Sequence, residues 1–348
     1  MSVAAPAVPP SQVSPNRVPP SHVPPSQSSG DEGVVQSDLR VATKEEIREL
    51  SQIDSVKFTA AVLLEFTVIG LAVWLSWTHF TWWSYLLAVC IIGPRIHALG
   101  VLMHEASHYR GYRNRKLNDF VGEIVAFCTT ASLEGYRKNH FAHHRHLNTD
   151  EDPDYVRNLL TGEFIFPQPL RTILWTLVRY GLGLKTWQTF TDYHKTEQVK
   201  DVSVRKSVIR MAVTLTIIGT SIWFGFWPML ILYWFIPILT TFSIVRYIRN
   251  VGDHVGMDHL PLEDRTRTVI SPLLEQWMIA PYGLNYHLEH HLYPSVTSFN
   301  LHKLHRIMMT REPYRSRAHV THGYLTGLLR ECLTSPSNPA PDTARVHS

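Results

Sequence analysis

Four apolar runs in this sequence of 348 residues constrain its fold more than any other feature. Each run contains at most two charged or histidine side chains, and the linkers inside each pair of runs are very short. A helix needs about 20 apolar residues to cross the hydrocarbon core of a bilayer. We therefore expect an all-α membrane protein with four transmembrane helices in two hairpins, at residues 58–77, 81–103, 207–227 and 228–245.

The charges beside these runs predict the orientation of the chain. Arg110, Arg113 and Arg115 follow the first hairpin, and Arg246 and Arg249 follow the second. Cytoplasmic loops of membrane proteins carry an excess of Lys and Arg. Two hairpins return the chain to one side, so both termini and both long polar segments are expected in the cytoplasm, beneath a bacterial inner membrane. We expect the net charge of +4 to interact with this membrane surface. Binding of nucleic acid is not expected, because the sequence lacks basic tracts interleaved with aromatic residues.

Outside the apolar runs, the composition divides the chain into further segments. The N-terminal stretch contains eight prolines, which block helix formation, and is expected to be disordered. A short amphipathic helix is expected over 38–55, where Thr43 and Glu46 form a capping box. The expected organisation is a tail at 1–33, an N-terminal helical region at 34–57, a membrane domain at 58–325 and a C-terminal tail at 326–348.

The 20 histidines are the compositional anomaly of this chain. Many of them fall into short clusters in which histidines are three or four residues apart, a spacing that aims side chains from one face of a helix at one point. Neutral imidazole is a good ligand for iron, zinc and copper. The clustered residues are His104, His108, His140, His143, His144, His254, His287, His290 and His291, with Asn250 one turn before His254.

Two kinds of metal site are compatible with the first cluster. Residues 104–108 read H-E-x-x-H, the helical motif of zinc metalloproteases, so a zinc intramembrane protease is one hypothesis. A single tetrahedral zinc would leave most of the clustered histidines without a role. Two metals with open coordination positions would use nearly all of them. We therefore favour a dinuclear site in a cytoplasmic helical cap, with redox-active iron that uses O2 to attack an unactivated C–H bond.

The four motifs "HEASH", "HFAHH", "NVGDH" and "HLEHH" together resemble the histidine boxes of the membrane fatty acid desaturase superfamily. The phrases "NRKLNDFVGE" and "GLNYHLEHHLYPSV" are also similar to phrases of that family, and the resemblance covers about residues 58–310. It implies two iron ions held by the nine clustered histidines, with Asn250 as a weaker or water-mediated ligand. It also implies O2 as co-substrate and a fatty acyl chain, reached through an acyl tunnel, in which a double bond is formed.

The resemblance leaves the substrate and the product open. The same chemistry on a small specialised metabolite, as in a rhizobitoxine-type desaturase, is one alternative, and hydroxylation or ketolation by the same centre is another. The sequence contains no H-P-G-G haem motif and no G-x-G-x-x-G dinucleotide loop. Electrons are therefore expected from a separate ferredoxin, or from a cytochrome b5-type protein with its reductase.

Charged residues near the boxes and inside a span are further candidates. Glu105, Asp253 and Glu289 lie within the clusters, where a carboxylate can accept the second N–H of a ligating histidine. Arg95 and His97 lie inside a predicted span. Contact with a polar substrate head is one role for them, and snorkelling toward the membrane interface is the interpretation that the sequence favours.

Overall fold

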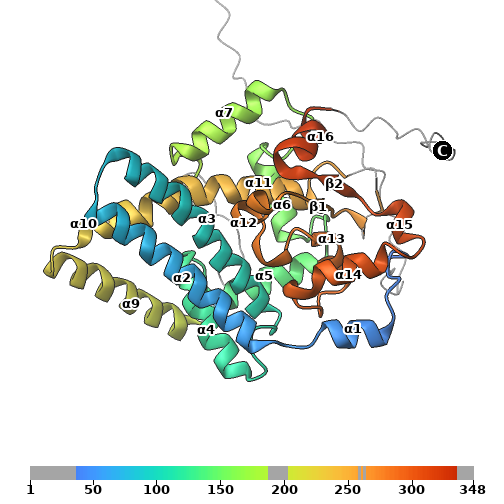
Figure 1. Ribbon diagram of the computed structural model, residues 1–348, viewed down its shortest axis with the longest axis horizontal. Helices are drawn as coiled ribbons and strands as arrows, with labels where there is room; N and C mark the ends of the chain where they lie inside the picture. Colours follow the sequence, from blue (N-terminus) through green and yellow to red (C-terminus); the bar gives the residue numbers. More distant parts are fainter. Residues whose placement is uncertain (1–36, 187–202, 258–259, 262–263, 335–348) are drawn as a thin grey trace, which may run out of the picture. The chain divides into compact units, whose positions relative to one another are not determined.

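The computed structural model describes residues 37–186, 203–257, 260–261 and 264–334, and these are mainly helical (Figure 1). The predicted tail at 1–33 lies outside them. The first helices are α1 (Lys44–Leu50), α2 (Ser55–Thr78), α3 (Trp82–Ser107), α4 (Arg115–Cys128), α5 (Leu133–Arg145), α6 (Pro153–Thr161) and α7 (Leu170–Gly181). They are followed by α9 (Val204–Trp223), α10 (Trp227–Leu230), the π-helical turns η2 (Ile231–Phe235) and η3 (Ile238–Phe242), and α11 (Ser243–His254).

The C-terminal part combines short helices with one small sheet. Strand β1 (Thr268–Ile270) pairs in parallel with β2 (Val320–His322). Around this pair lie α12 (Leu273–Ile279), η5 (Pro281–Gly283), α13 (His287–Leu292), η6 (Ser298–Asn300), α14 (Leu301–Met308), α15 (Tyr314–Arg317), η7 (Gly323–Leu328) and α16 (Leu329–Leu333). Cys332 is buried, so ordered structure extends into the segment predicted as a C-terminal tail.

The N-terminal helical region differs from its prediction in length. The capping box is confirmed, because Thr43 and Glu46 satisfy each other's backbone N–H groups. The single helix expected over 38–55 is wrong: α1 ends at Leu50, and Asp54 caps a new helix, α2. The Asp54 side chain accepts the backbone N–H of Lys57, and this bond fixes the start of the first long helix.

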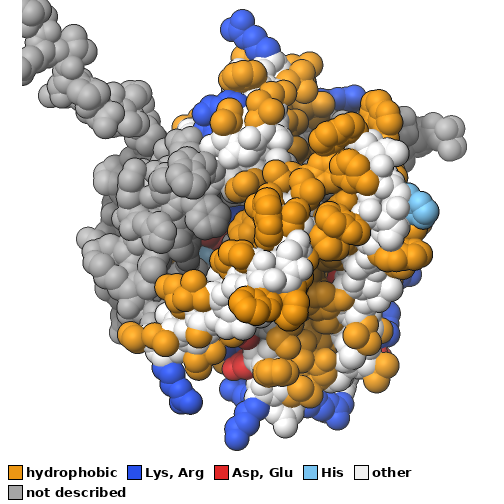
Figure 2. Space-filling view, turned by 90° about the vertical axis from the view of Figure 1, so that its left-hand side faces the viewer, with side chains coloured by type: hydrophobic (Ala, Val, Ile, Leu, Met, Phe, Trp, Pro, Cys, Tyr) orange, Lys and Arg blue, Asp and Glu red, His pale blue; other side chains and the backbone are white. Residues whose placement is uncertain are grey.

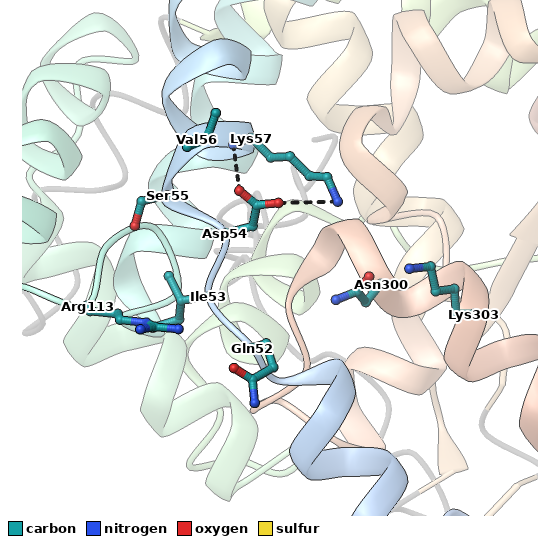
Figure 3. A pocket seen from close by; sticks show the side chains of 9 residues that line it. All are labelled: Gln52, Ile53, Asp54, Ser55, Val56, Lys57, Arg113, Asn300 and Lys303. Atoms are coloured by element: carbon teal, nitrogen blue, oxygen red, sulfur yellow. Dashed lines mark hydrogen bonds and ion pairs between the residues drawn. The ribbon is translucent and has the colours of Figure 1, made fainter.

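A surface pocket of about 570 Å³ lies beside this start of α2 (Figure 3). Lys57, Arg113 and Lys303 line it from three different segments, and Lys57 also pairs with Asp54 at 3.3 Å. Both side chains of this pair are well exposed, so the pair contributes little to stability. Positive side chains at the beginning of a long apolar helix fit a position at the membrane boundary.

Three helices among the described residues are long and apolar enough to cross a membrane: Ser55–Thr78, Trp82–Ser107 and Trp227–His254. They correspond to three of the four predicted spans, and the third of them joins α10, η2, η3 and α11. Helix α9 coincides with most of the remaining predicted span, at 207–227, but Arg205, Lys206 and Arg210 make its first turns polar. The fourth span therefore stays a prediction.

The long helices expose apolar side chains that a water-soluble protein would bury. Trp82 and Trp83 on α3 are 71% and 82% exposed, and Trp223 at the end of α9 is 84% exposed. Figure 2 shows a face on which hydrophobic side chains predominate, while Lys and Arg lie at its margins. Large exposed apolar surfaces of this kind indicate contact with lipid.

Helix α3 forms the centre of the apolar core and carries the first histidine cluster at its end. Ile92, Ile96 and Leu99 are fully buried, and α3 packs against α2, α4 and η3. Helix α3 lies very close to η3 at Gly93. A Cβ atom placed there would lie 2.5 Å from the backbone nitrogen of Phe242 and would also collide with Thr241. Only glycine allows α3 and η3 to lie this close.

Substitution of this glycine tests the packing. We expect Gly93→Ala to lower the free energy of unfolding by about 1–3 kcal/mol, because the added methyl group forces two backbones apart. The matched control is Gly70→Ala in α2, where nothing lies within 4 Å of the new Cβ. The thermal midpoint of each full-length variant in the same detergent measures the effect. Equal midpoints for Gly93→Ala and the parent would contradict this account of the packing.

Candidate metal centre

Four elements bring the clustered histidines together. His104 lies in the last turn of α3 and His108 is its C-cap. Helix α5 carries three of the histidines, α11 ends at His254, and α13 consists largely of the last box. Because each cluster lies at the end of a helix or on a short helix, the imidazoles of all four elements point into one space.

The first group contains five histidines, whose ligand nitrogens all lie within 4.8 Å of one another: His104, His108, His140, His144 and His290. The Nε2 atom of His108 lies 2.8 Å from that of His140. The Nε2 atom of His290 lies 3.0 Å from those of both His104 and His144. A metal–nitrogen bond of about 2.1 Å with ligands at right angles separates neighbouring nitrogens by about 3.0 Å. The spacing of this group therefore fits one metal ion.

The second group contains four histidines with ligand nitrogens within the same limit: His143, His254, His287 and His291. The Nε2 atom of His287 lies 2.9 Å from that of His254 and 3.1 Å from that of His291. Helices α5 and α13 contribute to both groups, and the rings of His144 and His291 are stacked with centroids 4.3 Å apart. The two groups are thus neighbours, and the arrangement suits a pair of ions.

The donors of both groups are suited to binding a cation at neutral pH. Burial, together with the neighbouring imidazoles, holds the pKa of five histidines on α5 and α13 well below the usual range: His140, His144, His287, His290 and His291. A neutral imidazole keeps the lone pair that binds a metal. The set therefore supplies many nitrogen ligands and no negative charge.

Asp152 orients one of these histidines and was not predicted from the sequence. Its Oδ2 atom lies 2.8 Å from Nδ1 of His143, and both side chains are buried. Burial lowers the pKa of His143, but this hydrogen bond and the charges of Asp154 and Asp152 outweigh it and raise the pKa. The bond leaves Nε2 of His143 directed at the second group. The position of Asp152 at the N-cap of α6, shortly after the second histidine cluster, was the available signal.

The three predicted carboxylates have different neighbours. Asp253 lies nearest to a clustered histidine, with Oδ2 at 3.6 Å from Nε2 of His287 and at 2.9 Å from Arg249. Glu105 accepts the backbone N–H of Ser298 with both oxygens, at 3.1 Å. These contacts attach the first histidine cluster to the segment that follows the last one.

Glu289 serves a similar purpose from within the last histidine box. It is fully buried and is hydrogen-bonded to Thr268, His305 and Tyr314. These partners belong to β1, α14 and α15, so the carboxylate fixes α13 from the side away from the histidine groups. Among the described contacts of Glu289, none is to a clustered histidine.

Asn250 lies one turn before His254 on α11, and its side-chain amide is paired with another amide. Its Nδ2 donates to Oδ1 of Asn158 at 2.9 Å, and Nδ2 of Asn158 donates back at 3.2 Å. Asn158 comes from α6 and was not predicted from the sequence. The role of Asn250 as a direct or water-mediated ligand stays a prediction.

Arg95 and His97 lie in the middle of α3, and both are buried. The snorkelling predicted for Arg95 is wrong: its side chain is 1% exposed, and Nη1 contacts Oε1 of Glu65 at 3.1 Å. A buried partner on α2 holds the guanidinium inside the protein. His97 packs beside Phe242, and its Nε2 has no hydrogen-bond partner among the described residues.

Comparison with known proteins gives consistent matches. The fatty acid desaturase family model matches residues 80–324. The dihydrorhizobitoxine desaturase of Bradyrhizobium elkanii is 27% identical over 77% of this chain and 80% of its own length. The sphingolipid delta(4)-desaturase/C4-monooxygenase of Homo sapiens is 27% identical over 69% of this chain and 71% of its own. The sn-1 oleoyl-lipid 12-desaturase of Anabaena variabilis is 24% identical, over 73% and 77%.

The bond between Asp152 and His143 predicts that loss of the Asp152 carboxylate weakens metal binding in the second histidine group and leaves the first group unaffected. Replacing Asp152 by Asn preserves the cap of α6 but removes the carboxylate that orients His143. Loss of such a partner typically costs 10- to 100-fold, roughly, in metal affinity. We expect Asp152→Asn to fall toward one metal ion per chain after dialysis against a chelator, by elemental analysis of purified protein. The exposed control Asp150→Asn should keep two, and equal retention by both variants would contradict the role of Asp152.

Proposed function

This chain belongs to the fatty acid desaturase family and is a desaturase, and we propose that it forms a carbon–carbon double bond in a fatty acyl chain with two iron ions and O2. The proposal rests on one observation above all. Nine histidines in two adjacent groups have ligand nitrogens about as far apart as the neighbouring ligands of a metal ion.

The donor set fits iron well. Nitrogen ligands without accompanying thiolates suit iron among the first-row metals, and up to five histidines per group leave room for another ligand. Bound iron would supply the one-electron steps and the reaction with O2 that protein side chains lack. The chain itself orients the imidazole of His143 through Asp152 and buries most of the clustered histidines, which limits the access of bulk water to the reacting carbons.

The overall reaction balances with an external reductant. A CH2–CH2 unit loses two hydrogen atoms and becomes CH=CH. O2 accepts four electrons, two from the substrate and two from the donor, and with two further protons it becomes two molecules of water. We propose a ferredoxin, or a cytochrome b5-type protein with its reductase, as the separate donor of the two electrons.

The topology that we propose has four membrane spans, with the metal centre and both termini in the cytoplasm. The exposed apolar side chains of α9, among them Val208, Leu215 and Ile222, support its assignment as the fourth span. Arg205 and Lys206 at its start would then lie at the cytoplasmic boundary. The basic residues that follow the second and fourth of the proposed spans support the same orientation.

The protease hypothesis is disfavoured by Glu105. A zinc protease uses this glutamate of the H-E-x-x-H motif as a general base that activates water. Here both carboxylate oxygens accept the backbone N–H of Ser298, and the side chain is 3% exposed. His104 and His108 belong to a group of five histidines, more than a single catalytic zinc uses.

Substitution of one histidine of the first group tests the function. We expect His290→Ala to abolish double-bond formation, because it removes one of the five nitrogens around one ion. The matched control is His302→Ala, outside both groups, which should keep the activity of the parent chain. Mass spectrometry of lipids and soluble metabolites from cells that produce each variant gives the answer.

The mass change identifies the reaction and the molecule identifies the substrate. Loss of two hydrogens from acyl lipids supports the proposal, and the same loss from a small metabolite would replace the substrate. One relative is named both a desaturase and a C4-monooxygenase, so gain of oxygen is also sought. Activity that survives His290→Ala would contradict the dinuclear centre.

A further inference from the structure

A cavity of about 580 Å³ lies where α2 and α3 meet the segment α12–η5. Glu65 and Arg95 line it from the two membrane helices, and Trp277 and Tyr282 line it from the other side. Leu273 and Leu274 on α12 also line it and are 83% and 70% exposed. The cavity thus lies between two helices long enough to cross a membrane and a short helix with an apolar outer surface.

The wall of this cavity contains a buried ion pair. Nη1 of Arg95 contacts both carboxylate oxygens of Glu65, at 3.1 and 3.3 Å, and both side chains are 1% exposed. Tyr282 donates its hydroxyl proton to the same carboxylate, and Nη2 of Arg95 donates to the carbonyl of Trp277. The guanidinium carbon lies 3.8 Å from the centre of the Trp277 ring. The positive and negative charges cancel within the wall.

Stability alone gives a weak reason for this pair. Taking two charges out of water costs several kcal/mol, and apolar residues of similar size often serve the fold equally well. Ionisable residues within membrane helices usually mark a functional site. One donor in this wall is also unused: Nε of Arg95 is buried and has no hydrogen-bond partner among the described residues. A bound molecule with an acceptor atom would complete its hydrogen bonding.

We propose that this cavity binds the uncharged carbonyl group, ester or amide, of an acyl lipid, with Nε of Arg95 as the donor. The proposal deepens the proposed function and rests on it for the identity of the reaction. A carbonyl oxygen accepts the free N–H without adding charge. A carboxylate would add an uncompensated negative charge beside Glu65 in a site with little access to water.

The position of Arg95 along α3 sets the length of such a substrate. His104, a member of the first histidine group, follows Arg95 by nine residues, which is about 13 Å along a helix axis. An extended chain advances about 3.5 Å over three bonds, so this distance corresponds to roughly ten bonds. The reacting carbons would therefore lie about that far from the carbonyl group. A metabolite with only a few bonds between its polar group and the reacting carbons does not span the distance.

Photo-crosslinking of the unaltered protein tests the location. The probe is a phosphatidylcholine that carries a diazirine beside the ester carbonyl of one acyl chain, incorporated with the full-length protein into nanodiscs. We expect crosslinked peptides that contain Arg95, Trp277 or Tyr282, and their yield should fall when unlabelled phosphatidylcholine is added. Crosslinks confined to other peptides, such as those of α9, would overturn the proposal.

Removal of one charge tests the selectivity. Glu65→Gln keeps the shape of the side chain but leaves Arg95 with an uncompensated positive charge. Methyl palmitate and palmitate, competed against a fluorescent acyl probe on purified full-length protein, should show the ester preferred by the parent chain. We expect Glu65→Gln to shift the ratio of the two affinities at least tenfold toward palmitate. The control Asp54→Asn removes the charge of an exposed ion pair on the same helix and should leave the ratio unchanged (Figure 3).

A second variant separates the donor from the charge. Arg95→Lys retains a cation beside Glu65 but removes the Nε donor, so affinity for methyl palmitate should fall severalfold without a change toward palmitate. An unchanged preference in Glu65→Gln, or full ester affinity in Arg95→Lys, overturns the proposal. The proposed function fails by a different result, namely no double bond in cells that produce the parent chain together with an electron donor. The ratios of affinities are measured without turnover, so they test the binding proposal independently of whether a double bond is formed.

Discussion

The convergence of nine imidazoles in two adjacent groups is the constraint on which the rest of the structure depends. Nitrogens about 3 Å apart cannot be held by flexible segments, because each imidazole must be fixed in position and direction. Elements that carry the histidines are therefore held in place by buried polar contacts with their neighbours. Glu105 attaches the end of α3 to Ser298, and Glu289 attaches α13 to the sheet and to α14 and α15. These carboxylates stabilise the backbone around the site, whereas Asp152 orients a single ring.

The sequence carries enough information to predict the long helices and the histidine groups, because both depend on local periodicity. Spans need about 20 apolar residues, and histidines three or four apart share a helix face. The second layer of the site was not predictable in the same way. Asn158 and Ser298 reach their partners through contacts between distant segments, 92 and 193 residues apart in the sequence. Asp152 is only nine residues from His143, but their contact depends on how the chain turns between α5 and α6. Without a fold, Glu105 and Glu289 look like partners of the histidines beside them in the sequence.

The two incorrect expectations have physical causes of the same kind. The helix expected over 38–55 is interrupted because Asp54 finds a better role as the cap of the next helix. Arg95 was expected to extend toward water, since an isolated charge in a membrane helix does so. The structure instead provides Glu65 on the neighbouring helix at the same depth. In both cases a local rule holds until a partner elsewhere in the chain offers a lower free energy.

The exposed leucines of α12 bear on how such an enzyme would sample its substrates. Leu273 and Leu274 are exposed and border the opening of the proposed site, which would then face the acyl chains of the bilayer. Molecules would then reach it by lateral diffusion in two dimensions, and their mole fraction in the leaflet, instead of their concentration in water, would set the occupancy. The rate of the enzyme would therefore depend directly on the lipid composition of the membrane. Cooling, or any other change that alters the lipids of the membrane, would alter the flux through the site without any change in the protein.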